Sequence, residues 1–334
     1  MKPIRNVLIT GGAGYVGTLL TPQLLELGYN VLVYDTMYYG CELKPQDRLR
    51  IVQGDIRDTK FLKENLWGID AVISLGCISN DAGYELNEDL SKTINYDCFE
   101  PMVKAAKEQG VHRFIYASSS SVYGVSDAPE VTEDHPLKPV SLYNEYKGKC
   151  EPLLFKHADD SFTCVTIRPA TLCGYSPRQR LDLSVNILTN HAVNNGKIVV
   201  FGGSQQRPNL HVQDMCDLYK LLLTLEDEKI QGETFNAGYE NQSIDDIALE
   251  VKKVVEEEFP DRAPIEIEHT PTNDIRSYRI TSTKIQQKLG FTPKRNIGDA
   301  VRDLCKAFKE GKLPNSMTDE GYHNVKVLKS KGIM

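Results

Sequence analysis

Tyr143 and Lys147 stand four residues apart in a segment, Leu142–Lys156, whose apolar spacing predicts a helix. Because four residues make about one helical turn, we expect both side chains on the same face. Removal of hydride from an alcohol carbon requires a base for the hydroxyl proton. A phenol, with an ordinary pKa of about 10, is protonated at neutral pH, but a neighbouring ammonium and a positively charged hydride acceptor would both favour phenolate. The spacing therefore predicts Tyr143 as a catalytic base and Lys147 as its supporting cation.

A run of serines strengthens this prediction. Ser118–Ser121 follow an apolar segment, Arg113–Ala117, that we expect to be a buried strand. Ligands of parallel sheets bind at the carboxyl ends of the strands, so one of these hydroxyls can lie beside the tyrosine. For most members of the run, a polar loop is the better interpretation. Tyr322 and Lys326 repeat the tyrosine–lysine spacing without a strand or serines, and we attribute that repeat to chance.

A glycine-rich turn, GGAGYVG at residues 11–17, follows the first apolar segment, Asn6–Thr10. It contains both G-x-G-x-x-G and G-x-x-G-x-x-G. In dinucleotide-binding sheets such glycines make the turn, let the diphosphate approach the backbone, and allow close packing of helix on strand. The diphosphate then lies on the free N–H groups at the start of the helix. The predicted cofactor contacts in this turn are Gly11, Gly14, Tyr15, Val16 and Gly17. The alternative is a tight turn in an α/β protein that binds no nucleotide.

An acid stands where such a site needs one. Asp35 lies 18 residues after Gly17, at the end of the apolar segment Val31–Tyr34. A carboxylate there accepts hydrogen bonds from the adenosine ribose and repels a 2′-phosphate. The next residue is Thr36 and not an arginine, so the sequence favours NAD over NADP. In this setting we expect Lys147 also to hold the nicotinamide ribose.

A second acidic segment, Gly54–Asp58, ends the third apolar segment. Asp55 and Ile56 can hold the adenine there, with the carboxylate accepting from its exocyclic amine. A polar strand end explains the same residues equally well.

Strand-like and helix-like segments alternate through the first half of the chain. Such alternation is typical of a doubly wound α/β sheet, because buried parallel strands read as continuous apolar runs and helices cover both faces. The predicted strands are Asn6–Thr10, Asn30–Tyr34, Leu49–Gln53, Ala71–Leu75, Arg113–Ala117 and Thr163–Arg168. The predicted helices are Tyr15–Leu27, Lys60–Asn65, Asp89–Gln109 and Leu142–Lys156.

The pattern changes after Arg168. Residues 169–180 resemble a loop, and we expect a smaller C-terminal α+β substrate lobe built from discontinuous pieces. The predicted division is a Rossmann-type domain at 1–175 with returning segments at about 209–240, a lobe at 176–208 and 241–314, and a loosely attached tail at 315–334. The elements predicted here are helices Leu183–Asn194, Asp214–Leu225, Ser243–Glu258 and Thr283–Leu289, and strands Ile198–Phe201, Thr234–Ala237 and Pro264–His269.

Composition narrows the class of protein. The net charge is -7, which argues against a nucleic-acid binder that relies on phosphate contacts. No run approaches the roughly 20 apolar residues of a membrane-spanning helix. The eight cysteines form no C-x-x-C and the seven histidines form no zinc-binding pair, so we expect reduced thiols, no metal and a cytoplasmic protein.

Taken together, these motifs resemble the extended short-chain dehydrogenase/reductases, in particular their NAD-dependent nucleotide-sugar epimerase/dehydratase family. The resemblance covers about Ile4 to Ala307. The motifs that carry it are GGAGYVG, VYD, GDIRD, SSSSVYG, PVSLYNEYK and RPNLHVQD. The family implies a Rossmann-type sheet, bound NAD, and a nucleotide-diphosphate sugar as substrate.

The resemblance also implies roles for particular residues. The hydroxyl that assists the tyrosine is the one three positions before Val122, which is Ser119. Leu75 and Gly76 stand where the family contacts the cofactor. The substrate contacts implied are Ser119, Asn186 and Arg207, with Arg207 expected on the diphosphate. Thr171 is expected to contact the substrate with a hydroxyl where the family has a sugar-contacting amide. A second diphosphate arginine is missing just before Asp274, and Arg276, in preference to Arg279, is expected to replace it. Members often form homodimers through the helices that correspond to 89–109 and 142–156; Phe99, Met102, Leu153 and Leu154 are available there for a dimer contact or, equally, for core packing.

Several positions depart from the family pattern. Ser120 and Ser121 stand where 4,6-dehydratases carry two acids, and a decarboxylase also needs an acid at the second position. Both chemistries are therefore expected to be disabled. The stretch 176–186 resembles a subgroup that oxidises unusual nucleotide-linked sugars, GDP-heptoses among them.

We therefore expect a nucleotide-sugar epimerase that oxidises and re-reduces C4. The alternative that the sequence leaves open is a C4 dehydrogenase or 4-keto reductase with net redox turnover. A non-catalytic NAD-binding sensor is disfavoured by the complete set of Ser119, Tyr143 and Lys147.

Overall fold

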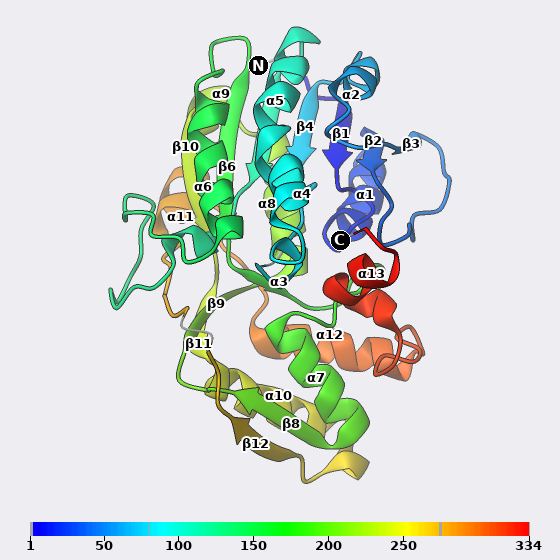
Figure 1. Ribbon diagram of the computed structural model, residues 1–334, viewed down its shortest axis with the longest axis vertical. Helices are drawn as coiled ribbons and strands as arrows, with labels where there is room; N and C mark the ends of the chain where they lie inside the picture. Colours follow the sequence, from blue (N-terminus) through cyan, green and yellow to red (C-terminus); the bar gives the residue numbers. More distant parts are fainter. Residues whose placement is uncertain (1–2, 80, 274–275, 334) are drawn as a thin grey trace.

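The computed structural model describes residues 3–79, 81–273 and 276–333. Its main sheet has seven strands in the order β10-β6-β5-β4-β1-β2-β3, and every pair is parallel (Figure 1). These strands are β1 (Asn6–Thr10), β2 (Asn30–Asp35), β3 (Leu49–Gln53), β4 (Ala71–Ser74), β5 (Arg113–Ala117), β6 (Thr163–Pro169) and β10 (Glu233–Ala237). The predicted doubly wound α/β fold is confirmed.

Helices cover both faces of this sheet because successive strand side chains point to opposite faces. In β1, Val7 and Ile9 belong to one apolar cluster, whereas Leu8 belongs to the other. The helices on the Val7 face are α1 (Gly17–Glu26), α8 (Val212–Thr224) and α11 (Thr283–Leu289). Those on the Leu8 face are α2 (Thr59–Asn65), α5 (Phe99–Glu108) and α6 (Leu142–Phe155).

The strand order reverses between β1 and β4. Connections on the two sides of this point run in opposite directions, which opens a crevice at the carboxyl ends of the strands. The glycine turn follows β1, Gly76 follows β4, and Ser119 follows β5. The topology therefore brings the predicted cofactor and catalytic residues to one edge of the sheet.

A smaller lobe, below the main sheet in Figure 1, has an apolar core of its own. It contains the parallel pair β8 (Lys197–Phe201) and β12 (Glu266–Thr270) with helices α7 (Ser184–Asn195), α10 (Ile244–Glu258) and α12 (Ile297–Lys309). A three-stranded sheet in the order β11-β9-β7 adds β7 (Thr171–Cys173), β9 (Gln206–His211) and β11 (Glu240–Ser243). Ser243 caps α10 within a capping box closed by Asp246.

Some elements differ from the predictions. Residues 171–173 form a strand where a loop was expected, and both β9 and α12 were missed. The first turn of α12 carries a capping box between Asn296 and Asp299, a signal that the sequence offered. Helix α11 was assigned to the lobe, but Ile285 packs into the core of the main sheet.

The predicted helix 89–109 is interrupted. It consists of α4 (Glu88–Lys92), a π-helical segment η1 (Thr93–Asp97) and α5. Asn95, in the π-helical segment, accepts from the backbone N–H of Ile78 at 2.8 Å and donates to its carbonyl at 2.9 Å. The irregularity thus fixes the segment that follows β4. The remaining short elements are α3 (Asp81–Tyr84), η2 (Ser120–Tyr123), α9 (Asp227–Ile230), η3 (Pro260–Arg262), η4 (Glu320–Tyr322) and α13 (Asn324–Ser330).

The prediction of a loosely attached tail is wrong. Helix α13 lies at the junction of the main sheet and the lobe (Figure 1). Leu328 is fully buried in the cluster that contains Leu8. Lys331 Nζ donates to the carbonyl of Tyr38, after β2, at 2.6 Å. Polar composition misled the prediction because two apolar side chains, Val327 and Leu328, suffice to dock one short helix.

The apolar residues considered for a dimer contact pack inside the chain. Phe99, Met102 and Leu154 are buried in the core, and Leu153 is partly buried against it. Core packing, which the sequence left open as one of two explanations, therefore accounts for the first three. Within the described part of the chain, no helix combines the length and the apolar character needed to cross a membrane.

Candidate active site

The glycine turn is shaped so that side chains would obstruct it. Gly11 has a φ of +70° and its backbone N–H donates to the carbonyl of Tyr34 at 2.9 Å. A Cβ on Gly11 would lie 2.7 Å from the backbone of Gly76, and one on Gly17 would lie 2.3 Å from the carbonyl oxygen of Gly12. Strand β1, the start of α1 and the end of β4 therefore meet at van der Waals distance. No side chain of the described residues caps the start of α1, so N–H groups at this end of the helix are available to a ligand.

Asp35 ends β2 beside this turn. One carboxylate oxygen accepts from Ala13 N at 3.0 Å and the other from Met37 N at 2.8 Å. Burial raises the pKa of Asp35, and these two bonds act in the opposite direction. The carboxylate is thus fixed in orientation at the edge of the sheet. Asp55, on the next strand end, is paired with Arg57 at 2.6 Å.

One cavity of about 790 Å³ joins most of the predicted residues. The predicted residues in its wall are Gly11, Gly14, Tyr15, Val16, Asp35, Asp55, Ile56, Leu75, Gly76, Ser119, Tyr143, Thr171, Arg207 and Arg276. Gly17, Lys147 and Asn186 are not among the lining residues.

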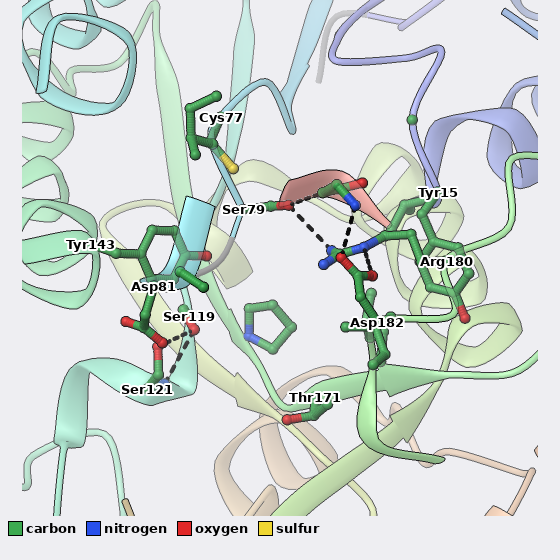
Figure 2. Close-up of a pocket in the computed structure, with 18 of the residues that line it drawn as sticks. Tyr15, Cys77, Ser79, Asp81, Ser119, Ser121, Tyr143, Thr171, Arg180 and Asp182 are labelled. Atoms are coloured by element: carbon green, nitrogen blue, oxygen red, sulfur yellow. Dashed lines mark hydrogen bonds and ion pairs between the residues drawn. The ribbon is translucent and has the colours of Figure 1, made fainter. Parts of the chain in front are cut away.

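Tyr143 and Ser119 face the same part of this cavity, opposite Tyr15 and Arg180 (Figure 2). Tyr143 lies in the first turn of α6, which Ser141 caps, and Ser119 follows β5. Burial raises the pKa of Tyr143 well above its ordinary value; Cys77 and Asp81 add to the rise, and the positive charge of Arg180 opposes it. Burial and the neighbouring groups together favour the protonated form of this phenol.

Lys147, one turn after Tyr143 in α6, is not among the residues that line the cavity. Its ammonium donates to the carbonyl of Ala117 at 2.7 Å and lies 5.2 Å from the ring centroid of Tyr116. The side chain is only 4% exposed. In this arrangement Lys147 joins α6 to the end of β5, the strand that precedes Ser119.

Asn186 is fully buried away from the cavity. Its amide donates to Tyr15 Oη at 3.2 Å and to the carbonyl of Arg180 at 2.9 Å, and it accepts from Gly174 N at 3.0 Å. The expected contact with a substrate is therefore replaced by one that orients Tyr15. Tyr15 Oη in turn donates to the carbonyl of Gly174 at 2.6 Å.

The two arginines expected to hold a diphosphate are brought together. Arg207 projects from β9 and donates to the backbone carbonyl of Arg276, and Arg276 forms an ion pair with Asp81. Asp81 also accepts from Ser141 and, at 3.3 Å, from the side-chain amide of Asn144. Sequence reasoning missed Asp81, because its segment matches no motif.

Other lining residues were also missed. Tyr278 Oη lies 3.2 Å from Ser120 Oγ and is held there by a segment far along the chain. Arg178 and Arg180 carried a visible signal, two arginines in the unusual stretch after residue 175, but no role was inferred for them. Among the described residues, no group of three metal-ligating side chains is present.

Comparisons with known proteins agree with this geometry. The family model described as "NAD dependent epimerase/dehydratase family" matches residues 7–238. A UDP-glucose 4-epimerase of Lactobacillus helveticus is 28% identical, with 91% of this chain and 97% of that protein covered. The dTDP-D-glucose 4,6-dehydratase of Mus musculus is 27% identical, with 92% and 89% covered. The solved UDP-glucose 4-epimerase of Thermotoga maritima, with UDP-glucose, superposes with a TM-score of 0.82 at 22% identity, covering 91% of this chain and 99% of that one.

The chain belongs to the NAD-dependent epimerase/dehydratase family. The predicted cofactor, NAD, is confirmed by this membership. The residues present fit a dinucleotide, because no described side chain caps the start of α1 after the crowded glycine turn, while Asp35 is fixed at the adjoining strand end. The matched relatives act by more than one reaction, so family membership alone does not select among them.

Proposed function

We propose that this protein is a nucleotide-sugar epimerase that inverts C4 of a nucleotide-diphosphate hexose. The observation that supports it best is the single cavity in which Ser119 and Tyr143 lie between the glycine turn and the Arg207–Arg276 pair. A hydride-transfer site and an anion-binding site are thereby continuous. Nucleotide-diphosphate sugars are named for relatives of both kinds: UDP-glucose for an epimerase and dTDP-D-glucose for a dehydratase.

NAD, when bound, supplies the chemistry of accepting a hydride from C4 and returning it. Tyr143 takes the proton of the C4 hydroxyl and gives it back when the ketone is reduced. Ser119 hydrogen-bonds the same oxygen and stabilises the charge that develops on it. Burial raises the pKa of Tyr143, and a positively charged cofactor beside the phenol would act in the opposite direction and favour the phenolate that accepts this proton.

The arginines hold the other end of the substrate. Guanidinium groups suit a diphosphate because they present several donors in one plane. Arg207 is anchored by its hydrogen bond to the backbone carbonyl of Arg276, so it can bind the diphosphate without losing its position. Thr171 lies in the wall between the two ends and offers a hydroxyl to the sugar. Rotation of the keto sugar within the cavity then exposes its other face to the returning hydride.

The serines at 120 and 121 favour epimerisation over elimination. Ser121 Oγ donates to Asn144 Oδ1, and Ser120 Oγ contacts Tyr278 Oη. Neither position offers a carboxylate that could protonate a leaving hydroxyl or abstract a carbon-bound proton. The absence of an acid at these two positions supports reduction of a 4-keto intermediate over elimination.

The test is a label experiment at C4. Purified protein is incubated with UDP-, GDP-, CDP- and dTDP-hexoses that carry deuterium at C4, and products are examined by NMR and mass spectrometry. We expect a C4 epimer that keeps the deuterium, without accumulation of NADH. Stoichiometric NADH would instead establish a dehydrogenase, and loss of one water would establish a dehydratase; either result overturns the proposal.

A matched pair of tyrosine variants locates the chemistry. Tyr143→Phe is expected to lower turnover by about 10²- to 10⁴-fold, the usual contribution of a positioned acid–base group. The control is Tyr146→Phe. Tyr146 lies in the same helix, but its ring packs on Tyr96 outside the cavity wall, so this variant is expected to keep wild-type turnover. Equal losses in the two variants would contradict the assignment.

A further inference from the structure

A segment from Ser176 to Asp182, called here the arginine loop, lies across the start of α1. Ser176 Oγ donates to the carbonyl of Tyr15 at 2.6 Å, and Arg178 N donates to Thr18 Oγ1 at 3.3 Å. The loop is thereby fixed over the glycine turn. Its two arginines both line the cavity.

These two arginines are buried with too few acceptors. Arg178 is 4% exposed and Arg180 is 7% exposed. Arg180 pairs with Asp182 at 2.8 Å and donates to Ser79 Oγ at 3.2 Å. Its second terminal nitrogen, Nη2, is buried and has no hydrogen-bond partner among the described residues. Burial and the neighbouring Arg180 lower the pKa of Arg178 to about 10, as expected where two cations share one carboxylate.

The position of the pair along the cavity identifies what it faces. The charge of Arg178 reaches Asp35, the acid expected at the adenosine ribose. The charge of Arg180 reaches Tyr143, at the end where hydride is transferred. The part of a dinucleotide between its adenosine ribose and its nicotinamide is the diphosphate. An anion there would lie within reach of both the glycine turn and the two guanidinium groups, which line the same cavity.

The C-terminal helix holds the arginine loop in place. Asn324, the first residue of α13, accepts from Arg178 Nη2 at 2.7 Å and donates to Ser79 Oγ at 3.1 Å. Its backbone N–H donates to Asp182 at 3.1 Å. Asn324 therefore joins the arginine loop to the segment after β4.

Two further contacts complete this cover. Leu181 N donates to the carbonyl of Tyr322 at 2.9 Å, and Lys331 ties the end of α13 to the segment after β2. In that segment the ring of Tyr39 lies 4.4 Å from the guanidinium carbon of Arg178. Residues after β2, after β4 and from the arginine loop thus converge on one short helix.

We propose that Arg178 and Arg180 bind the diphosphate of NAD together with the glycine turn, and that α13, through Asn324, keeps them there and retains the cofactor. Arg178 and Arg180 contact the ligand directly, and Asn324 is a positioning residue. NAD leaves only when α13 undocks. Retention of NAD suits a reaction in which the hydride returns at the same site. The role given to Arg178, Arg180 and Asn324 depends on NAD binding and needs no assumption about the sugar.

The test compares ligands that contain or lack the diphosphate. NAD, ADP-ribose and adenosine are titrated into full-length wild-type protein and into Arg178→Met, Arg180→Met and the double variant. We expect NAD and ADP-ribose to bind about 10- to 100-fold more weakly to each single variant, the usual effect of losing a charged hydrogen bond, while adenosine binding stays within twofold. Arg→Lys variants should recover part of the loss. Arg302→Met, which removes an exposed arginine of α12, is the control.

Retention is measured as the rate at which NAD dissociates after dilution into competing ligand. Asn324→Ala should raise the dissociation and association rates together, so that Kd changes less than either rate. Unchanged NAD affinity in the folded double variant, or an equal loss for adenosine, would overturn the diphosphate assignment, and an unchanged dissociation rate in Asn324→Ala would overturn the role of α13. If wild-type protein does not bind NAD, the proposed function fails as well. If wild-type protein binds NAD and the variants bind and release it in the same way, only this inference fails and the proposed function stands.

Discussion

Ser119 Oγ lies 2.7 Å from Ser121 Oγ. Since Ser121 donates its only hydroxyl hydrogen to Asn144 Oδ1, Ser119 donates to Ser121 and presents its lone pairs to the cavity. This arrangement suits a substrate that arrives as an alcohol. The hydroxyl hydrogen of Ser119 points to Ser121 Oγ, so this hydroxyl must rotate away from Ser121 before it can donate to the ketone.

Replacement of the two serines should therefore have unequal effects. Ser119→Ala is expected to lower kcat by about 10²-fold because a donor to the developing oxyanion is lost. Ser121→Ala frees the Ser119 hydroxyl and should change kcat by less than about tenfold. Steady-state rates with the active nucleotide sugar decide the matter. A larger loss in Ser121→Ala would show that the two roles are exchanged.

The pH dependence of turnover should report the charge of Arg180. Burial raises the pKa of Tyr143, so the phenolate needed for oxidation becomes populated only as the pH rises. Arg180 opposes that rise in pKa, and Arg180→Met should therefore move the rising limb of the kcat profile to higher pH. Profiles are recorded at saturating NAD, so that weaker cofactor binding does not contribute.

Arg178→Met is the control for this experiment. It removes a neighbouring cation whose charge acts on Asp35, so the midpoint of the kcat profile should stay in place while NAD binds more weakly. A shift of equal size in both variants would assign the effect to cofactor binding and not to the Tyr143 pKa.

A buried ion pair beneath the active site should be essential for stability. Arg168 and Glu151 meet at 2.6 Å, and both are less than a tenth exposed. Glu151 also accepts from Ser118 Oγ at 2.6 Å. Glu151→Gln leaves the arginine charge uncompensated, and a loss of about 3–5 kcal/mol in the free energy of unfolding is expected. Urea denaturation measures it.

The double variant Arg168→Met/Glu151→Leu should recover much of that loss, because both charges are removed together. If the double variant is as unstable as Glu151→Gln, the hydrogen bonds to neighbouring groups, such as Tyr123 Oη at 2.7 Å from Arg168, contribute more than the charge balance.

Choice of coenzyme should depend on Asp35. Asp35→Asn removes the negative charge that repels a 2′-phosphate and leaves one fewer acceptor for the N–H groups of Ala13 and Met37. NAD affinity should fall about tenfold or more, and NADP affinity should fall less or rise. Titration of both coenzymes gives the ratio of Kd values. An unchanged ratio would show that the ribose lies elsewhere, provided that unfolding of the free variant matches wild type.

Local pattern determined the central sheet. Each predicted strand of the first half is present within one residue at either end. These strands could be located because buried parallel strands appear in a sequence as continuous apolar runs. The glycine turn was equally readable, since a site where a Cβ would approach the backbone of Gly12 to 2.3 Å permits only glycine at position 17. The prediction of NAD followed from this turn and Asp35, and that of Tyr143 from its spacing to Lys147, whereas the family and the choice of Ser119 followed from the resemblance of the motifs.

Contacts between distant segments decided the rest. Asn186 was expected at the substrate, but its amide is satisfied by Tyr15, which lies 171 residues away in the chain. The Tyr143 pKa depends on how deeply α6 is buried, and the role of Asn324 depends on a helix that docks through two apolar side chains. Sequence reports which groups are available locally, whereas burial and long-range pairing exist only once the chain has folded, and they set the charge and orientation of every group in this site.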